Sequence, residues 1–333
     1  MSNSNLIKLT SSEIASLWQE YISHTHSRCM LLYLIATTKD EEIVSVLKEA
    51  FTIVEETKEA TLSIIKKENL PIPIGFSDED VNTKAKKLFS DSFSLYYIKN
   101  LSRVMASACG LMMTMSTRGD IRTHYEKCTV RAFKVFNSVS DVLLQKGLYV
   151  RPPHIQPNTQ SVYIKGKQYL DGYRLIREER PLNAVEISHV FGNLEANLTG
   201  ITFTKAFGQT IEDKEVRDFM SDSVNMGKEI ISKLSTFLTS SDLSAPMPSD
   251  IHVNPITESA FSNKYMMYQM STMMASGISG YASSLAASMR NDLKTAYMEF
   301  LTETSKLARK GANIMIANQW LEQPPQPASL DRE

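Results

Sequence analysis

Carboxylates and histidines occur at helical spacing in the first half of the chain. His24 lies on the apolar, inward-facing line of Leu17 and Leu31, and Glu20 precedes it by one helical turn. Carboxylate and imidazole ligands that converge from several helices are the usual way in which a helical bundle holds iron. Later helical stretches supply three further candidate ligands, which are Glu55, Glu59 and His124. These five residues define one hypothesis, a mononuclear site for a divalent metal such as iron.

A structural interpretation of the same residues competes with the metal site. In that interpretation His24 is a hydrogen-bonded core histidine, and the glutamates form a solvated helix face. The second half of the chain has Asn193 and Asn197 where the first half has Glu20 and His24, and neutral amides are poorer metal ligands. A di-iron site is not expected, because the one Glu-x-x-His of the sequence, Glu186–His189, begins in the first turn of a helix.

The helices that must position these side chains are encoded twice, because the sequence contains a tandem repeat. Adding 173 to the residue number takes Glu13 to Glu186, and a shift of 172 takes Arg118-Gly-Asp120 to Arg290-Asn-Asp292. Equivalent residues keep the same order throughout, which indicates a duplication. Each Arg-x-Asp stands at the start of a fourth helix, where we expect it to join two helices at the bundle end.

Each half contains four long helical stretches. Capping boxes at Thr10–Glu13 and Asn183–Glu186 open the first stretch of the two halves. In the first half the other three are expected at about 40–69, 88–115 and 117–147. The link between the second and third stretches carries Pro71 and Pro73, and at about 3.3 Å per residue it is long enough to traverse a bundle.

The predicted fold is all-α, with two tandem four-helix bundles. Each bundle is expected to be ferritin-like, with a long crossover between helices two and three. Residues 1–150 form the first bundle, residues 151–182 a linker that begins with prolines, and residues 183–333 the second bundle. Trp18 and its equivalent Phe191 are expected to be buried, each in the core of its own bundle.

Composition excludes several classes of function. The chain has 36 basic and 37 acidic residues, so no positive surplus exists for binding nucleic acid. Its apolar runs are too short to span a membrane, and the N-terminus lacks a secretion signal, which predicts a cytoplasmic protein. Three separate cysteines, Cys29, Cys109 and Cys128, lie in apolar helical sequence and are expected to be reduced core residues.

Both halves end in a distinctive way. The first half ends at Gln145–Pro153, the second at Ala312–Pro325, and the first crossover begins with Leu70–Phe76. Together with the Arg-x-Asp pairs, these segments resemble a duplicated bundle family of unknown function from spore-forming bacteria. The ending after Lys146 is also similar to spore coat protein F and its relatives. The resemblance implies a ferritin-like fold and an association with sporulation, with no established activity and no catalytic residue to carry over.

The favoured function is that of a structural or interaction protein without enzymatic activity or cofactor. It would be cytoplasmic or associated with the spore coat, and it would act through protein partners that the sequence does not identify. The alternative is a ferritin-like metal-binding protein with an oxidase-type site in the first bundle. A mid-bundle cluster of Glu and His on three facing helices would favour the alternative, and an apolar layer would favour the structural function.

Overall fold

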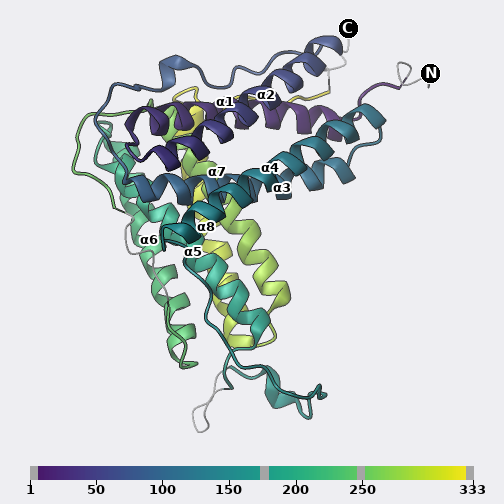
Figure 1. Cartoon of the computed structure of the whole chain (residues 1–333), viewed down its shortest axis with the longest axis vertical. Coiled ribbons are helices and arrows are strands. Elements are labelled where there is room, and N and C mark those ends of the chain that lie inside the picture. Colours follow the sequence, from purple (N-terminus) through teal and green to yellow (C-terminus); the bar gives the residue numbers. More distant parts are fainter. Residues whose placement is uncertain (1–6, 173–179, 246–251, 328–333) are drawn as a thin grey trace. The chain divides into compact units, whose positions relative to one another are not determined.

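The chain folds into two compact units. The computed structural model (Figure 1) describes residues 7–172, 180–245 and 252–327. By their contacts, residues 1–147, 258–265 and 319–333 form the first unit, and residues 148–257 and 266–318 form the second. No helix in the described ranges is both long and apolar enough to cross a membrane.

Four long helices make up most of the first unit. They are α1 (Ser11–Thr37), α2 (Glu41–Lys67), α3 (Asp91–Thr114) and α4 (Gly119–Gln145). Helix α1 packs against α2 and α3 against α4, and α2 also contacts both α3 and α4. Short links join the two antiparallel pairs, whereas the segment from 68 to 90, with the 3-10 helix η2 (Asp78–Asp80), returns along the bundle from α2 to α3 (Figure 1). The predicted crossover is confirmed.

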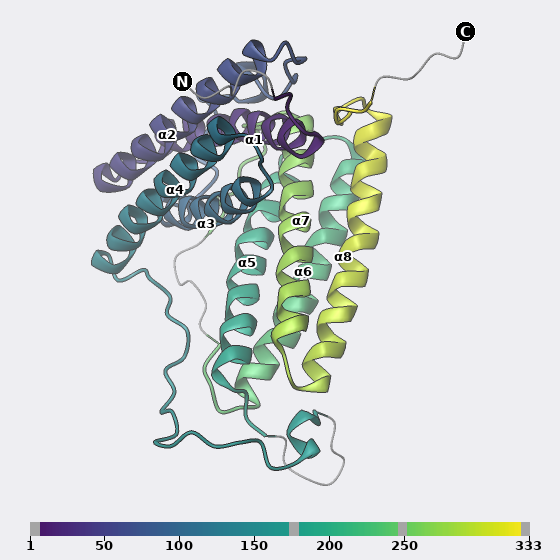
Figure 2. The same cartoon turned by 90° about the vertical axis from the view of Figure 1, so that its right-hand side faces the viewer.

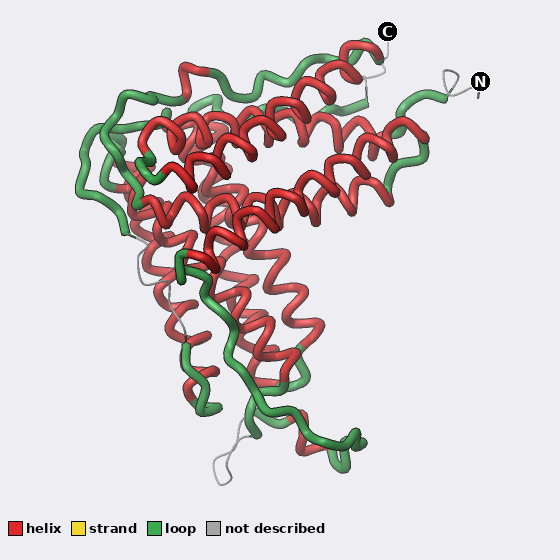
Figure 3. Tube along the Cα trace, viewed as in Figure 1, coloured by secondary structure: helices red, strands yellow, loops and turns green. Residues whose placement is uncertain are grey.

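The second unit repeats this arrangement. Its helices are α5 (Ala184–Gly208), α6 (Lys214–Thr239), α7 (Asn263–Ala287) and α8 (Asn291–Ala317), preceded by the 3-10 helix η3 (Lys167–Leu170). The four long helices run side by side (Figure 2), and the segment from 240 to 262 joins α6 to α7. Regular structure in the described ranges is helical (Figure 3), apart from isolated bridge residues such as the pair Val81 and Phe261. The prediction of an all-α chain with two tandem bundles is confirmed.

A buried carboxylate anchors the start of the first bundle. Thr10 and Glu13 form the predicted capping box at the start of α1. The Glu13 side chain is fully buried, and its Oε1 accepts hydrogen bonds from the backbone N–H groups of Thr117 and Arg118, both at 2.8 Å. Arg118 in turn pairs with Asp120 and Glu68. The carboxylate therefore ties the first turn of α1 to the link between α3 and α4.

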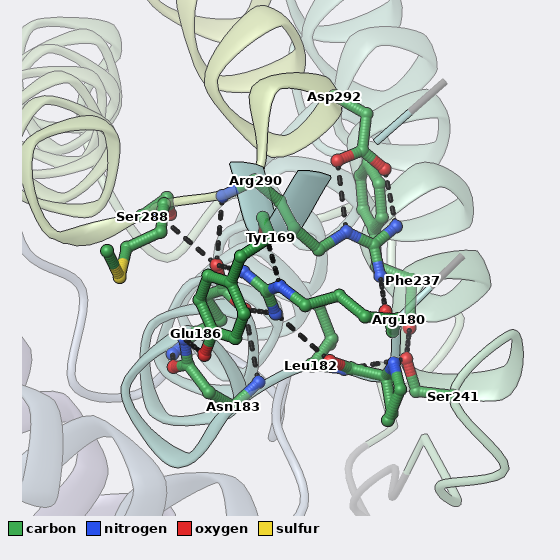
Figure 4. A network of polar contacts seen from close by, with 12 residues as sticks. Tyr169, Arg180, Leu182, Asn183, Glu186, Phe237, Ser241, Ser288, Arg290 and Asp292 are labelled. Carbon is green, nitrogen blue, oxygen red and sulfur yellow. Dashed lines mark hydrogen bonds and ion pairs between the residues drawn. The ribbon is translucent and has the colours of Figure 1, made fainter. Parts of the chain in front are cut away.

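The second bundle has the same anchor in Glu186. Its Oε1 accepts from the backbone N–H groups of Met289 and Arg290, at 3.1 and 3.0 Å. Arg180 adds two hydrogen bonds to the Glu186 carboxylate, at 2.7 and 2.8 Å, and stacks on the ring of Tyr169 (Figure 4). Arg290 pairs with Asp292, as Arg118 does with Asp120. The contact of Arg118 with Glu68 at the end of α2 agrees with the predicted joining of two helices, whereas Arg290 donates to the backbone carbonyl of Arg180 at 2.8 Å, before α5 begins.

The cores follow the helical pattern with one correction. Phe191 is buried as expected, but Trp18 is only half-buried, whereas its neighbour Leu17 is fully enclosed with Tyr125. Consecutive residues of an α-helix are turned by about 100° around its axis, so a helix face centred on Leu17 leaves Trp18 at the edge. The prediction for Trp18 is wrong by this one-residue step.

Two segments of the second repeat complete the first unit. Ser262 donates a hydrogen bond from its backbone N–H to the carbonyl of Asp80 at 3.1 Å. The Glu322 carboxylate accepts from the backbone N–H groups of Ile74 and Gly75, at 2.9 and 3.3 Å. The two compact units defined by contacts therefore differ in their boundaries from the two halves defined by the sequence repeat. The boundaries 1–150, 151–182 and 183–333 stay a prediction based on the repeat, and residues 173–179 of the predicted linker lie outside the described residues.

We expect the two anchoring carboxylates to make stability depend on pH in the acidic range. Burial opposes the charged form of both carboxyl groups. Hydrogen bonds from the backbone N–H of Arg118 and from Thr10 and Thr117 nevertheless lower the pKa of Glu13. Hydrogen bonds, chiefly from Arg180, lower the pKa of Glu186. Because the folded pKa lies below the unfolded value of about 4.3, this stability is present above that pH and is lost as pH falls through the folded pKa.

Glu13→Gln and Glu186→Gln should each lower the free energy of unfolding at neutral pH by about 1–3 kcal/mol, because an amide cannot accept all of these bonds. Urea titrations between pH 3 and 7 should also show a flatter pH dependence in both variants. The exposed Glu126 on α4 is a matched control, as Glu126→Gln should change neither quantity. If the free energy of unfolding of the two variants changed with pH as steeply as that of the wild type, the anchoring role would be contradicted.

Candidate functional site

An ionic pair lies inside the first bundle. Glu20 of α1 and His124 of α4 meet at 2.7 Å between Oε2 and Nε2. The exposed fraction is 2% for the Glu20 side chain and 9% for that of His124. Leu17 and Tyr125, one turn or less away from these two residues, belong to the apolar core. The pair therefore joins two helices across a core that is otherwise largely apolar.

Both members of the pair are held in their charged forms. Burial opposes ionisation of Glu20, but the hydrogen bond and charge of His124 outweigh it and lower the pKa of the carboxyl group. Burial likewise opposes the imidazolium, while interactions with Cys128 and Glu20 raise the pKa of His124. A carboxylate and an imidazolium in a poorly solvated environment interact strongly, and each is costly to leave without the other.

Helix α2 supplies a third side of the cluster. Thr61 donates a hydrogen bond from its Oγ1 to Glu20 Oε2 at 2.8 Å. The other carboxylate oxygen, Glu20 Oε1, is buried without a hydrogen-bond partner among the described residues, as is Thr57 Oγ1 one turn before Thr61. A buried carboxylate oxygen without a donor carries a desolvation cost of about 1–3 kcal/mol or more. Glu20 Oε1 is therefore free to accept a hydrogen bond or to bind a cation.

His24 presents a second unused acceptor. Its Nδ1 lies 2.8 Å from the backbone carbonyl oxygen of Glu20, and because a carbonyl only accepts, Nδ1 carries the proton. Burial lowers the pKa of His24 and keeps its ring neutral. Nε2 then carries a lone pair, and it is buried without a hydrogen-bond partner in the described structure. An imidazole whose other nitrogen donates to a carbonyl has the usual arrangement of a metal-binding histidine.

Two cysteine sulfurs lie beside the ionic pair. Cys109 of α3 and Cys128 of α4 are buried and free. Their Sγ atoms and a carboxylate oxygen of Glu20 lie within 4.8 Å of one another, and Cys128 Sγ is 3.7 Å from His124 Nε2. A hydrogen bond with Cys109, together with burial, raises the pKa of the Cys128 thiol. All four helices of the bundle thus contribute a polar side chain to one layer.

Glu55 and Glu59 have different surroundings from the buried pair. Glu55 pairs with Arg28 at 3.1 Å and with Lys58 at 3.0 Å, and the more exposed Glu59 pairs with Lys58 at 3.3 Å. Both glutamates line a groove of about 780 Å³ between α2 and α4, together with His124 and Cys128. The structure therefore brings Glu20, His24 and His124 into one region and places Glu55 and Glu59 beside the groove.

The second bundle has an apolar layer at the equivalent positions. The repeat shifts of 173 and 172 take Thr57, Thr61, Cys109, His124 and Cys128 to Ile230, Leu234, Tyr281, Ala296 and Phe300. These five equivalents are buried in a single hydrophobic cluster. The two asparagines are hydrogen-bonded, since Asn193 Nδ2 donates to Ser284 Oγ at 2.6 Å and Tyr281 donates to Asn197 Oδ1 at 2.9 Å.

Four members of the layer were missed by the sequence analysis, namely Thr57, Thr61, Cys109 and Cys128. A buried cysteine usually behaves as a small apolar core residue, and a single threonine on a helix carries no charge or ligand pattern, so neither type signals a site alone. A signal was present in the repeat, because each of the four has an apolar or aromatic equivalent in the second half. A position-by-position comparison of the halves would have identified them.

We expect the buried pair to behave as a unit in stability measurements. His124→Ala alone should lower the free energy of unfolding by about 3–5 kcal/mol, because it leaves the Glu20 carboxylate buried and uncompensated. The double variant Glu20→Asn/His124→Ala, which installs the residues that the second bundle has at these positions, should lose less than His124→Ala. Urea denaturation of the three proteins measures both effects. A double variant that is no more stable than His124→Ala would contradict the coupling.

Comparisons with known proteins give the chain a family. No curated protein matches the sequence. A crystal structure of a Bacillus halodurans C-125 protein, provisionally described as a spore coat protein, is similar at 18% identity and a TM-score of 0.42, over 45% of this chain and 98% of the other. The family described as "Protein of unknown function (DUF3231)" matches twice, at residues 2–160 and 171–331. The chain therefore belongs to the DUF3231 family and contains two copies of its unit.

Proposed function

We propose that the protein binds one metal ion per chain, in the polar layer of the first bundle. The observation that carries this proposal is the buried Glu20–His124 pair with unused acceptors at Glu20 Oε1 and His24 Nε2. Carboxylate oxygen and imidazole nitrogen are the donors that divalent transition metals take in proteins. A bound cation would be held by the Glu20 carboxylate and would replace the proton on His124, with His24 Nε2 beside it as a further nitrogen donor.

A purely structural role explains this layer less well. Buried ion pairs contribute little net stability, and replacing them by packed apolar residues is often neutral or stabilising by about 1–4 kcal/mol. The second bundle packs apolar residues at five of the equivalent positions, including Ile230, Ala296 and Phe300. The same architecture is thus built without buried charge, and metal binding gives the first bundle a reason for the polar layer.

The groove between α2 and α4 supports the proposal by giving access to the layer. Its lining has four carboxylates, Glu55, Glu56, Glu59 and Asp120, against the two cations Lys127 and Arg131, and it reaches His124 and Cys128. Carboxylates along a groove raise the local concentration of cations. In this proposal Glu55 and Glu59, which the sequence analysis grouped with the ligands, guide the ion toward the buried donors.

For the second bundle we propose a structural or interaction role. Its layer is apolar and its buried asparagines are hydrogen-bonded, so it offers no comparable set of unused donors among the described residues. The sequence resemblance to spore-associated bundle proteins supports protein partners and an association with sporulation as the setting of this role.

Elemental analysis of the full chain, dialysed against metal, tests the proposal. The wild type should retain about one equivalent of a transition metal. Because the ligands all lie in the first bundle, His24→Ala/His124→Ala and Glu20→Asn/His124→Ala should retain none. The matched control is His189→Ala/Asn193→Ala, at the second-bundle positions equivalent to Ser16 and Glu20, which should retain the full equivalent. Absence of metal from the wild type, or equal retention by all variants, would overturn the proposal.

A further inference from the structure

We infer that Cys109 and Cys128 are ligands of the bound ion, so that the site is a closed, four-coordinate site for a thiophilic metal such as zinc. This inference rests on the proposed function and specifies its metal. Glu20 and the two cysteine sulfurs form one cluster, with one residue each from α1, α3 and α4. His124 of α4, which contacts Glu20 and lies near Cys128, would supply the fourth donor. The ferritin-like expectation differs, because iron bundles use mainly carboxylates with histidine.

The distances between donor atoms suit tetrahedral coordination. Bonds of about 2.0–2.3 Å to zinc place the donors of a tetrahedron about 3.3–3.8 Å apart. Cys128 Sγ lies 3.7 Å from His124 Nε2, and the two sulfurs and the Glu20 oxygen lie within 4.8 Å of one another. Side-chain rotations of Glu20, His124 and the two cysteines would have to bring these atoms to bonding distance around the ion. The Glu20–His124 contact of 2.7 Å would lengthen as the ion enters between them.

The donor types select the metal. Within the cluster of donors Glu20 is the one carboxylate, whereas Glu55 and Glu59 are engaged with Arg28 and Lys58. Oxygen-rich sites suit magnesium, calcium or manganese, and two sulfurs with one imidazole suit zinc. The geometry therefore favours zinc over the iron of the sequence hypothesis.

Charge changes on binding are balanced by proton release. The two thiols and the imidazolium would lose three protons to solvent as one divalent cation enters, leaving two thiolates, the Glu20 carboxylate and neutral His124 around the ion. The resulting net charge of the cluster is −1. Lys127 lines the adjoining groove and supplies positive charge beside the cluster, whereas Arg131, which also lines it, is paired with Glu56.

The second bundle is consistent with this ligand set. Tyr281 and Phe300 occupy the positions equivalent to Cys109 and Cys128, and Asn193 and Ala296 those of Glu20 and His124. All four donors are thus replaced together by residues that do not bind zinc in this way. The third cysteine, Cys29, is buried elsewhere in the first unit, where its Sγ lies 3.3 Å from the backbone carbonyl of Ser77.

Cobalt(II) titration of the full chain tests the inference. Cobalt takes the place of zinc and reports its ligands, because cobalt–thiolate bonds give an intense near-ultraviolet charge-transfer band. The wild type should show this band with one equivalent of cobalt, and zinc should abolish it by displacement. Cys109→Ser and Cys128→Ser should each weaken the band and lower cobalt affinity at least about tenfold, since even groups around the ligands change affinity by about 10–100-fold. Cys29→Ser is the matched control and should behave as the wild type.

Each result decides between the two proposals. Cobalt bound by the wild type without a charge-transfer band would overturn the cysteine ligands and leave the proposed metal binding intact. No cobalt, zinc or iron bound at all would overturn both. A band that persists in both serine variants would also overturn the inference. If circular dichroism shows that a serine variant has not folded, the wild-type spectrum and that of Glu20→Asn/His124→Ala, in which the band should be lost, still decide.

Discussion

The buried charge pair between Glu20 and His124 is the constraint on which the interior of the first bundle depends. Two opposite charges in a poorly solvated core are stable only while they remain together, so α1 and α4 are fixed in register at this level. Thr61 brings α2 to the same carboxylate, and Cys128 contacts the same imidazole. In the first bundle, charge and hydrogen bonds of this layer therefore fix which helix faces pack together, whereas in the second bundle the packing of apolar side chains does so.

The ends of both bundles are held by a different and shared device. Glu13 and Glu186 cap their own helices and also accept backbone N–H groups from the link between the third and fourth helices. Because one carboxylate satisfies amides of two chain segments, it fixes how the helices align at that end. The middle layers of the two bundles can then differ in chemistry without changing the fold.

The fold was largely predictable from the sequence, and the site only in part. Capping boxes, prolines and helical periodicity are local signals. They located α2, α3 and α4, and the starts of α1 and α5, to within a few residues, and the repeat indicated four helices in the second half as well. Glu20, His24 and His124 were found because polar residues on an apolar helix face are conspicuous. Glu55 and Glu59 show the limit of this reasoning, since only three-dimensional packing decides whether a glutamate faces the core or a groove lined by basic partners. The place of Thr61 and the two cysteines in the site follows only from the packing of the helices, which the sequence pattern does not give.

The polar layer of the first bundle and the apolar layer of the second fill the same place in the fold. Single substitutions that turn one layer partly into the other are expected to be destabilising. Replacing His124 by alanine while Glu20 stays leaves a buried charge without a partner, and adding a carboxylate at Asn193 would do the same beside Tyr297 and Leu194. Exchanging Cys128 for phenylalanine would place a large aromatic side chain against the charged pair, since Cys128 Sγ lies 3.7 Å from His124 Nε2. One layer can therefore become the other only through matched changes on several helices. This cooperativity explains how one chain holds a charged, thiol-containing layer in one bundle and an apolar, aromatic layer in its duplicate.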